Sequence, residues 1–165
     1  LSTILTDTWD SRIFGNARER GLVYSVFSAP DEIGSAASWW LGAQVSRSNS
    51  EAFIRLIRDE LSRVRDGEIE DTEFEAAQKH LLGKTMRAGQ TAAGLVSNYS
   101  KYYHHDAVPD LNKLPSIIKS VTPAKCTKLF QEMCDNNTWG LAVLGSTSLV
   151  PARRLDDYLS EIFEK

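Results

Sequence analysis

The apolar residues of this chain follow two periods, one typical of amphipathic helices and one typical of strands. Residues 4–19 repeat apolar positions at intervals of three and four, with Gly21 placed as a stop, which predicts one helix from about Ile4 to Glu19. Residues 22–28 and 35–45 flank a turn that contains Pro and Gly, so they predict a β-hairpin. Apolar residues occur on both sides of the first strand, which indicates that both of its faces are covered.

The second half of the pattern predicts a run of helices and one more strand. Apolar residues from Phe53 to Val64 mark one face of a strongly amphipathic helix. Thr72 and Glu75 have capping-box spacing and predict the start of the next helix, with Leu81 among its inward residues. Further helices are predicted over residues 91–104 and 111–120, after Thr122-Pro123 and after Pro151. The continuous apolar run WGLAVLG, residues 139–145, predicts a buried central strand.

This order of elements predicts an α+β fold, in which a mixed, mainly antiparallel sheet packs against several helices. Three strands form a thin sheet, and a buried strand needs neighbours on both edges, so we expect a further strand upstream of Leu1. The 165 residues contain no repeat, linker or low-complexity tract. We therefore expect one domain over residues 1–165.

Composition and charge narrow the class of protein. Hydrophobic residues make up 42% of the chain and charged residues 25%, as in soluble globular domains. The formal net charge of −3 offers no basic surface for nucleic acid, and no apolar run is long enough to cross a membrane. Cys126 and Cys134 lie eight residues apart in one predicted helix, roughly 12 Å, which is too far for a disulfide. Two free thiols are typical of a reducing compartment and predict a cytoplasmic protein.

The residues alone provide no catalytic set. A zinc hydrolase of the H-E-x-x-H or H-x-x-E-H type needs two His and a Glu at fixed offsets, and none of His80, His104 and His105 has them. A nucleophile elbow, G-x-S-x-G, is absent, and so are the glycine-rich phosphate-binding patterns. We therefore expect no metal ligand in this chain and a structural role for His80.

The most specific signal lies in residues 11–28, SRIFGNARERGLVYSVFS. Arg12, Arg18 and Arg20 occupy three of the nine positions from 12 to 20, at the end of the predicted helix and just after it, and Tyr24 follows on the predicted strand. A cationic helix end beside a tyrosine can bind a peptide backbone or a carboxylate. The alternative is structural, with the arginines complementing the helix C-terminus and the tyrosine packed in the sheet.

This stretch resembles the signature S-R-L-F-x-x-x-R-E-K-x-G-L-A-Y-S-V of the C-terminal, non-catalytic half of pitrilysin-type metallopeptidases, the insulinase family of inverzincins. The following segment DGEIEDTEFEAAQKHLLGK, residues 66–84, is similar to a helix start of that family. The run WGLAVLG followed by a helix is similar to the end of its domain. The resemblance covers nearly the whole chain and implies an α+β half-domain that closes like a clamshell with a second half around a peptide.

The resemblance also implies that zinc binding and substrate contact belong to different halves of the protein. Zinc and the H-x-x-E-H motif belong to the N-terminal half or a partner subunit, so this chain alone is expected to be inactive and to need that half for peptide or small-protein hydrolysis. By motif position, Tyr24 is the tyrosine that reaches the reacting carbonyl. The family signature also has an arginine before the glycine, but this sequence is one residue shorter between that arginine and Gly21. Aligned without a gap, the arginine position is Ala17, and aligned with a one-residue gap it is Arg18. Arg20 is the remaining candidate. The alternatives are a catalytically inactive assembly subunit of the family and a generic α+β interaction domain.

Overall fold

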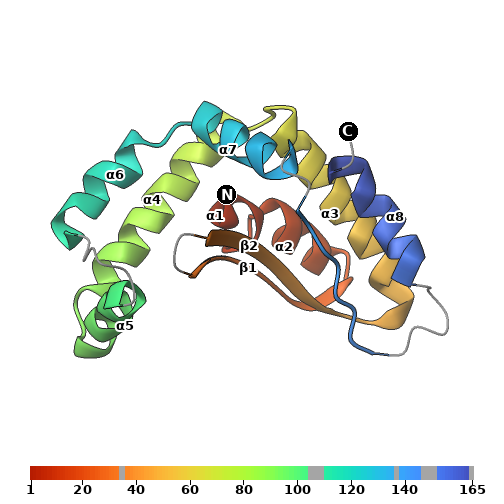
Figure 1. Cartoon of the computed structure of the whole chain (residues 1–165), viewed down its shortest axis with the longest axis horizontal. Helices are drawn as coiled ribbons and strands as arrows, with labels where there is room; N and C mark the ends of the chain where they lie inside the picture. Colours follow the sequence, from red (N-terminus) through yellow and green to blue (C-terminus); the bar gives the residue numbers. More distant parts are fainter. Residues whose placement is uncertain (34–35, 104–109, 136–137, 146–151, 164–165) are drawn as a thin grey trace.

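A computed structural model describes residues 1–33, 36–103, 110–135, 138–145 and 152–163 (Figure 1). Two strands, β1 (Val23–Ile33) and β2 (Ala36–Val45), pair as the predicted antiparallel hairpin. The helices are α1 (Ser2–Leu5), α2 (Arg12–Glu19), α3 (Ser50–Arg65), α4 (Asp71–Ala88), α5 (Ala92–Tyr103), α6 (Leu114–Ser120), α7 (Pro123–Asp135) and α8 (Ala152–Phe163). Short 3-10 turns, η1 (Arg47–Asn49) and η2 (Leu111–Lys113), precede α3 and α6. The α+β class predicted from the sequence is confirmed.

Helix α3 is the centre of the hydrophobic core. All five apolar residues predicted for its inner face are buried, namely Phe53, Ile54, Ile57, Leu61 and Val64. Helices α2, α7 and α8 pack against α3, and α1 and α2 pack against β1. The largest fully buried side chains come from these elements: Leu5, Ile13, Val64, Phe130, Cys134 and Ile162. One face of the hairpin is therefore held against helices.

The prediction of a single helix over residues 4–19 was wrong, because residues 6–11 form a polar break between α1 and α2. The Thr6 hydroxyl bonds to the Ser2 carbonyl and, at 2.7 Å, to Ser28 of β1. Ser11 is extended, with φ −70° and ψ 148°, and its hydroxyl donates to the Thr8 carbonyl. Side chains that bond to nearby backbone compete with helix formation, so this threonine- and serine-rich stretch turns instead.

Helices α4, α5 and α6 form an arm that extends from the core (Figure 1). No residue of α4 is buried, and Leu81, which we predicted to point inward, is exposed. The predicted capping box is also absent, since α4 begins at Asp71 with Glu70 as its extended N-cap residue, and Thr72 lies inside the helix. The carboxylate of Glu73 bonds instead to an arginine of α2, as described below.

Residues 139–145 do not form the predicted buried strand. Trp139 stacks on Phe163 of α8 at a ring-centroid distance of 5.1 Å, and Leu141 packs against the core. Val143 and Leu144, however, are exposed, and no strand pairing is assigned to these described residues. An apolar run becomes a central strand only when flanking strands accept its backbone hydrogen bonds, and within the described part of the chain the sheet has two strands.

Candidate functional site

The end of α2 aims the chain directly into β1. Gly21 has φ +63°, a left-handed conformation that glycine adopts without steric cost. The Leu22 amide donates to the Ala17 carbonyl at 2.8 Å, and the Gly21 amide donates to the Arg18 carbonyl at 2.9 Å. This pair of bonds is a Schellman motif, so the helix stop predicted at Gly21 is confirmed. The motif fixes the direction in which the strand carrying Tyr24 leaves the helix.

A β-bulge near the start of β1 turns Tyr24 away from the core. Val23 pairs with Val45, but Ser25 pairs with Gln44, so β1 has one extra residue at this point. Val26 and Ser28 are buried on the helix-facing side of the hairpin. Strict alternation from Val26 would turn Tyr24 to that same side, yet Tyr24 is 78% exposed. The bulge therefore corrects the expectation that both faces of β1 are covered.

The face of the hairpin away from the helices is open and aromatic. Phe27 and Trp40 are each 59% exposed, whereas neighbouring Trp39 turns to the helices and donates its indole N–H to the Ser2 hydroxyl at 2.9 Å. The small residues Gly42 and Ala29 stand opposite Phe27 and Trp40 in the register. The ring of Phe27 lies against Gly42, where a Cβ atom would come within 2.4 Å of its Cζ. We refer to Tyr24, Phe27, Ala29, Trp40 and Gly42 as the open aromatic face.

The two candidate arginines have different surroundings. The Arg18 guanidinium lies 4.2 Å from the centroid of the Trp9 ring, a cation–π contact that holds it over the α1–α2 turn. Arg20 is exposed at the C-cap of α2, and its side chain has no hydrogen bond or ion pair with any described residue. The Tyr24 hydroxyl is equally without a partner among those residues. The structure thus does not join either arginine to Tyr24, and Arg20 is the one that is free to move.

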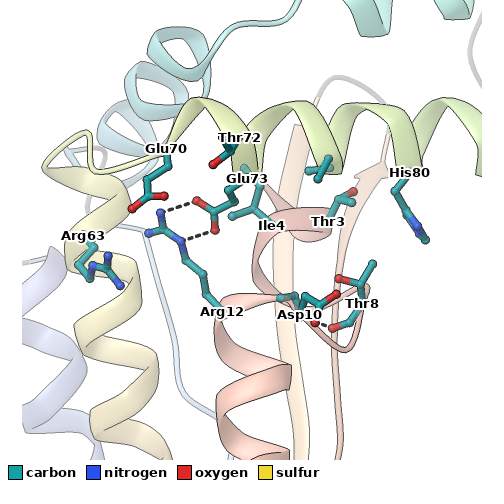
Figure 2. Close-up of a pocket in the computed structure, with 13 residues that line it drawn as sticks. Thr3, Ile4, Thr8, Asp10, Arg12, Arg63, Glu70, Thr72, Glu73 and His80 are labelled. Atoms are coloured by element: carbon teal, nitrogen blue, oxygen red, sulfur yellow. Dashed lines mark hydrogen bonds and ion pairs between the residues drawn. The ribbon is translucent and has the colours of Figure 1, made fainter.

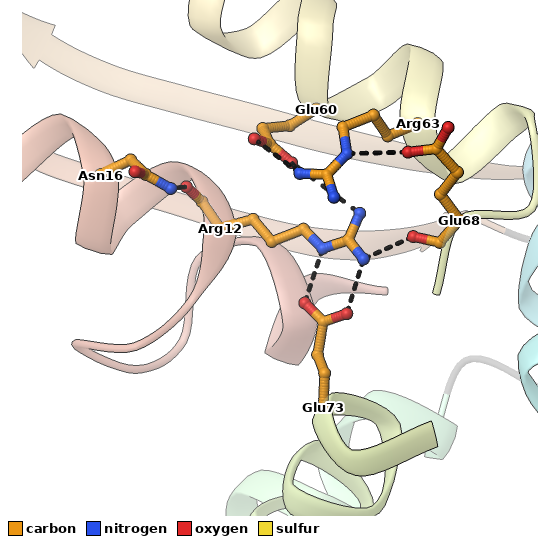
Figure 3. Close-up of polar contacts among 6 residues, drawn as sticks. All are labelled: Arg12, Asn16, Glu60, Arg63, Glu68 and Glu73. Carbon is orange, nitrogen blue, oxygen red and sulfur yellow. Dashed lines mark hydrogen bonds and ion pairs between the residues drawn. The ribbon is translucent and has the colours of Figure 1, made fainter. Parts of the chain in front are cut away.

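Arg12, the first of the three arginines, is buried in an ionic cluster (Figure 3). Its Nε and Nη2 donate to the two carboxylate oxygens of Glu73, both at 2.6 Å, and Nη2 also donates to the Glu68 carbonyl. Its Nη1 lies 3.8 Å from Glu60 Oε2, and Arg63 bonds to both Glu60 and Glu68. We call Arg12, Glu60, Arg63, Glu68 and Glu73 the Arg12 cluster.

The Arg12 cluster is structural, and sequence reasoning did not find it. It ties the start of α2 to the end of α3 and the start of α4 (Figure 3). A second Schellman motif, in which the Glu68 amide donates to the Arg63 carbonyl at 2.8 Å, turns the chain sharply after α3. The sequence signal was slight, since Arg12 precedes the apolar stripe that begins at Ile13, and its partner Glu73 is 61 residues away.

A cavity of about 600 Å³ lies beside the Arg12 cluster, between the α1–α2 turn and α4 (Figure 2). Thr3, Thr8, Asp10, Glu70, Arg12 and His80 are among its lining residues. His80 is half-buried and projects from α4 toward Thr8 in Figure 2. One turn further along α4, Lys84 forms an ion pair with Asp7 at 3.1 Å, so this face of α4 packs on the turn. The structural role expected for His80 stays a prediction, because this ion pair is made by Lys84 and not by the imidazole.

The described residues do not fit a zinc site. Across the described ranges, no group of three or more His, Cys, Asp or Glu side chains is placed so that it could hold a metal ion. His104 and His105 lie outside the described residues. Cys126 and Cys134 are free and buried on α7, and burial raises the pKa of the Cys134 thiol above its ordinary value. No helix in the described part of the chain is long and apolar enough to cross a lipid bilayer.

The α+β arrangement, with helices on one side of a hairpin and an open face on the other, agrees with the fold that the resemblance implies. Residues 1–81 match the family described as "Peptidase M16 inactive domain". This match and a related zinc protease confirm the resemblance to pitrilysin-type metallopeptidases. The match includes the whole of residues 11–28, from which the resemblance was drawn.

Relatives and solved structures agree with this assignment. An uncharacterized zinc protease of Streptomyces coelicolor is 27% identical over 162 residues, which are 95% of this chain and 34% of the relative. A protease from Helicobacter pylori has a similar fold, with a TM-score of 0.69 and 15% identity over 79% of this chain and 32% of that one. A protein from Alicyclobacillus acidocaldarius designated M16-like has a TM-score of 0.65 and 20% identity, over 80% and 31%. The chain thus spans about a third of the length of these proteins.

Proposed function

We propose that this chain is the non-catalytic half of a zinc-dependent endopeptidase, which closes the chamber and contacts the peptide substrate. The observation that carries the proposal is the bulge that exposes Tyr24 on the open face of the hairpin, with its hydroxyl unpaired among the described residues. If the role of Tyr24 were to pack in the core, regular alternation would place it there and no bulge would be needed. Zinc and the general base would come from the other half of the protein or from a partner subunit.

The proposed chemistry of this half is electrostatic. A phenol O–H can donate to the oxyanion that develops on the reacting carbonyl, and a guanidinium can bind a substrate carbonyl or carboxylate. Arg20 is the better candidate for the second role, because Arg18 is stacked on Trp9 and would have to leave that ring. Gly21 separates Arg20 from the strand, so both candidate groups extend from one short segment, residues 20–24.

The test uses the full-length protein with its catalytic half. Tyr24→Phe removes only the hydroxyl and is expected to lower kcat by about a hundredfold, the effect of losing one oxyanion donor, while zinc content stays unchanged. Tyr99→Phe, on the exposed surface of α5, is the matched control and should leave kcat unchanged. An unchanged kcat in Tyr24→Phe, or hydrolysis by the isolated 165-residue chain supplied with zinc, would contradict the proposal.

A catalytically inactive assembly subunit of the same family is the second candidate. The observation in its favour is the arm, where Met86, Val96 and Ile117 are exposed apolar side chains of the kind that subunit interfaces cover. A full-length protein that binds no zinc, hydrolyses no peptide and loses assembly when Val96 is changed to Ser would favour this function over the first.

A further inference from the structure

We infer that Phe27 and Trp40 form a specificity subsite for an apolar side chain of the peptide that Tyr24 contacts. This inference rests on the proposed function and names the class of side chain that the open aromatic face would select. The resemblance drawn from residues 11–28 gives no role to either aromatic residue. Trp40 lies outside that segment, and Phe27 was expected to be covered.

The exposure of these two rings is unusual for a hairpin that also contributes to a core. On the helix-facing side, Trp39, Leu41 and Val45 of β2 pack against buried residues. On the other side, Phe27 and Trp40 leave more than half of their surface in water. Exposed aromatic surface that is contiguous with a candidate site is typical of ligand contact.

The register places a small apolar residue, Ala29, next to both rings. Ala29 stands opposite Trp40 in the register and two residues after Phe27 on the same face of β1, and it is exposed. Phe27 and Trp40 are diagonal neighbours across the two strands, roughly 7–8 Å apart, and Ala29 is next to both of them on the same face. The Phe27 ring is held by Gly42, and the Trp40 indole N–H donates to Ser38 at 3.1 Å. Both rings are thus oriented before any ligand arrives.

Charge decides the class of side chain. Next to the two rings the face contributes Ala29, and toward Tyr24 it contributes Ser25 and Gln44, none of which is charged, whereas Asp31 stands beyond Ala29, opposite Ser38. An acidic side chain placed there would lose water without gaining a partner, and a basic one would find only the exposed Asp31 at the far end, whereas an aromatic or long aliphatic side chain would bury apolar surface. Phe27 lies three residues from Tyr24, about 10 Å along a strand. The selected side chain is therefore two or three residues from the one that Tyr24 contacts.

The experiment compares peptides that differ only in that side chain, Phe, Leu, Ala or Lys, with the full-length protein. The unmodified protein should show the highest kcat/KM for the Phe and Leu peptides. Trp40→Ala should reduce the ratio of kcat/KM for the Phe peptide over the Ala peptide by about tenfold. Ala29→Leu keeps both rings and fills the space above Ala29 with a larger side chain, so it should reduce the same ratio. Tyr99→Ala, another exposed aromatic residue on the distant α5, should leave the ratio unchanged.

The outcomes separate this inference from the proposed function. If Tyr24→Phe lowers turnover but Trp40→Ala and Ala29→Leu leave the peptide preference unchanged, the subsite is refuted and the proposed function stands. If the full-length protein hydrolyses no peptide, fluorescence titration of the same peptides replaces kcat/KM, and equal affinity for the Phe and Ala peptides refutes the subsite. Loss of contact between the two halves in Trp40→Ala, measured by sedimentation, would show instead that the face is an internal interface.

Discussion

The Arg12 cluster gives the sharpest prediction about stability. The Arg12 side chain is 8% exposed, and its partners Glu60 and Glu73 are 10% and 25% exposed. Arg12→Met keeps the apolar part of the side chain but leaves Glu73 without either of its hydrogen bonds from Arg12. Breaking a buried ion pair from one side costs about 3–5 kcal/mol. Because a quarter of Glu73 reaches water and Glu60 keeps Arg63, we expect the lower end, about 3 kcal/mol.

A double-mutant cycle isolates the pair. Glu73→Gln keeps one acceptor for Arg12 and should cost about 1–2 kcal/mol, the loss of charge-assisted bonding. The variant that combines Arg12→Met with Glu73→Gln removes both charges, so it should be more stable than Arg12→Met alone. The free energy of unfolding is measured by urea titration, followed by tryptophan fluorescence.

Lys84→Met is the control for loss of an ion pair. It breaks the Lys84–Asp7 pair, whose lysine side chain is 59% exposed, and exposed pairs contribute at most about 1 kcal/mol. The reasoning is refuted if Arg12→Met loses no more stability than Lys84→Met. It is also refuted if the cycle gives a coupling energy below about 0.5 kcal/mol.

Three further predictions concern separate parts of the fold. Gly21→Ala, at φ +63°, should lower the free energy of unfolding by about 1–2 kcal/mol, as measured by urea titration, whereas no loss would contradict the Schellman motif. Cys126 and Cys134 are buried, and burial raises the pKa of the Cys134 thiol, so both should react with a thiol reagent only after urea is added. Hydrogen bonds from Arg55 and Tyr158 lower the pKa of Glu51, so Glu51 stabilises the fold above about pH 4.5, and this stability is lost as the pH falls through the lowered native pKa. The acid slope of the unfolding free energy should therefore be shallower in Glu51→Gln, and an unchanged slope would contradict this assignment.

Local patterns predicted the elements whose partners lie nearby in the chain. The hairpin, the buried face of α3 and the stop at Gly21 follow from alternation, helical period and glycine conformation, and each is present. The helix predicted after Thr122-Pro123 is also present as α7, and the Lys125 amide donates to the Thr122 hydroxyl at 3.3 Å. For these elements the sequence carries the information within about one turn or one strand pair.

The errors arose where a distant residue decides the outcome. Arg12, Arg18 and Arg20 look alike as a run of cations, but only Arg12 meets the acidic residues at the end of α3 and the start of α4. Leu81 is exposed because of what the arm does and does not pack against, and the spacing of apolar residues within α4 gives no information about that. The bulge at Tyr24 depends on how β1 pairs with β2, so alternation along β1 alone assigned both faces to the core.

The bulge also changes how positions along β1 are to be counted. Val23 and Val26 are three positions apart, which regular alternation would put on opposite faces, yet both contribute to the core side of the hairpin. At the bulge, odd-numbered and even-numbered positions of β1 exchange faces: odd positions face the core before it, and even positions face the core after it. Removing Ser25 would restore regular alternation with Tyr24 opposite Gln44, so the hydroxyl would stay on the open side, whereas removing Tyr24 would lose it, and in both cases the pairing from Val26 onward would stay in register. The bulge thus gives β1 one additional residue on the open side without moving any residue of the core.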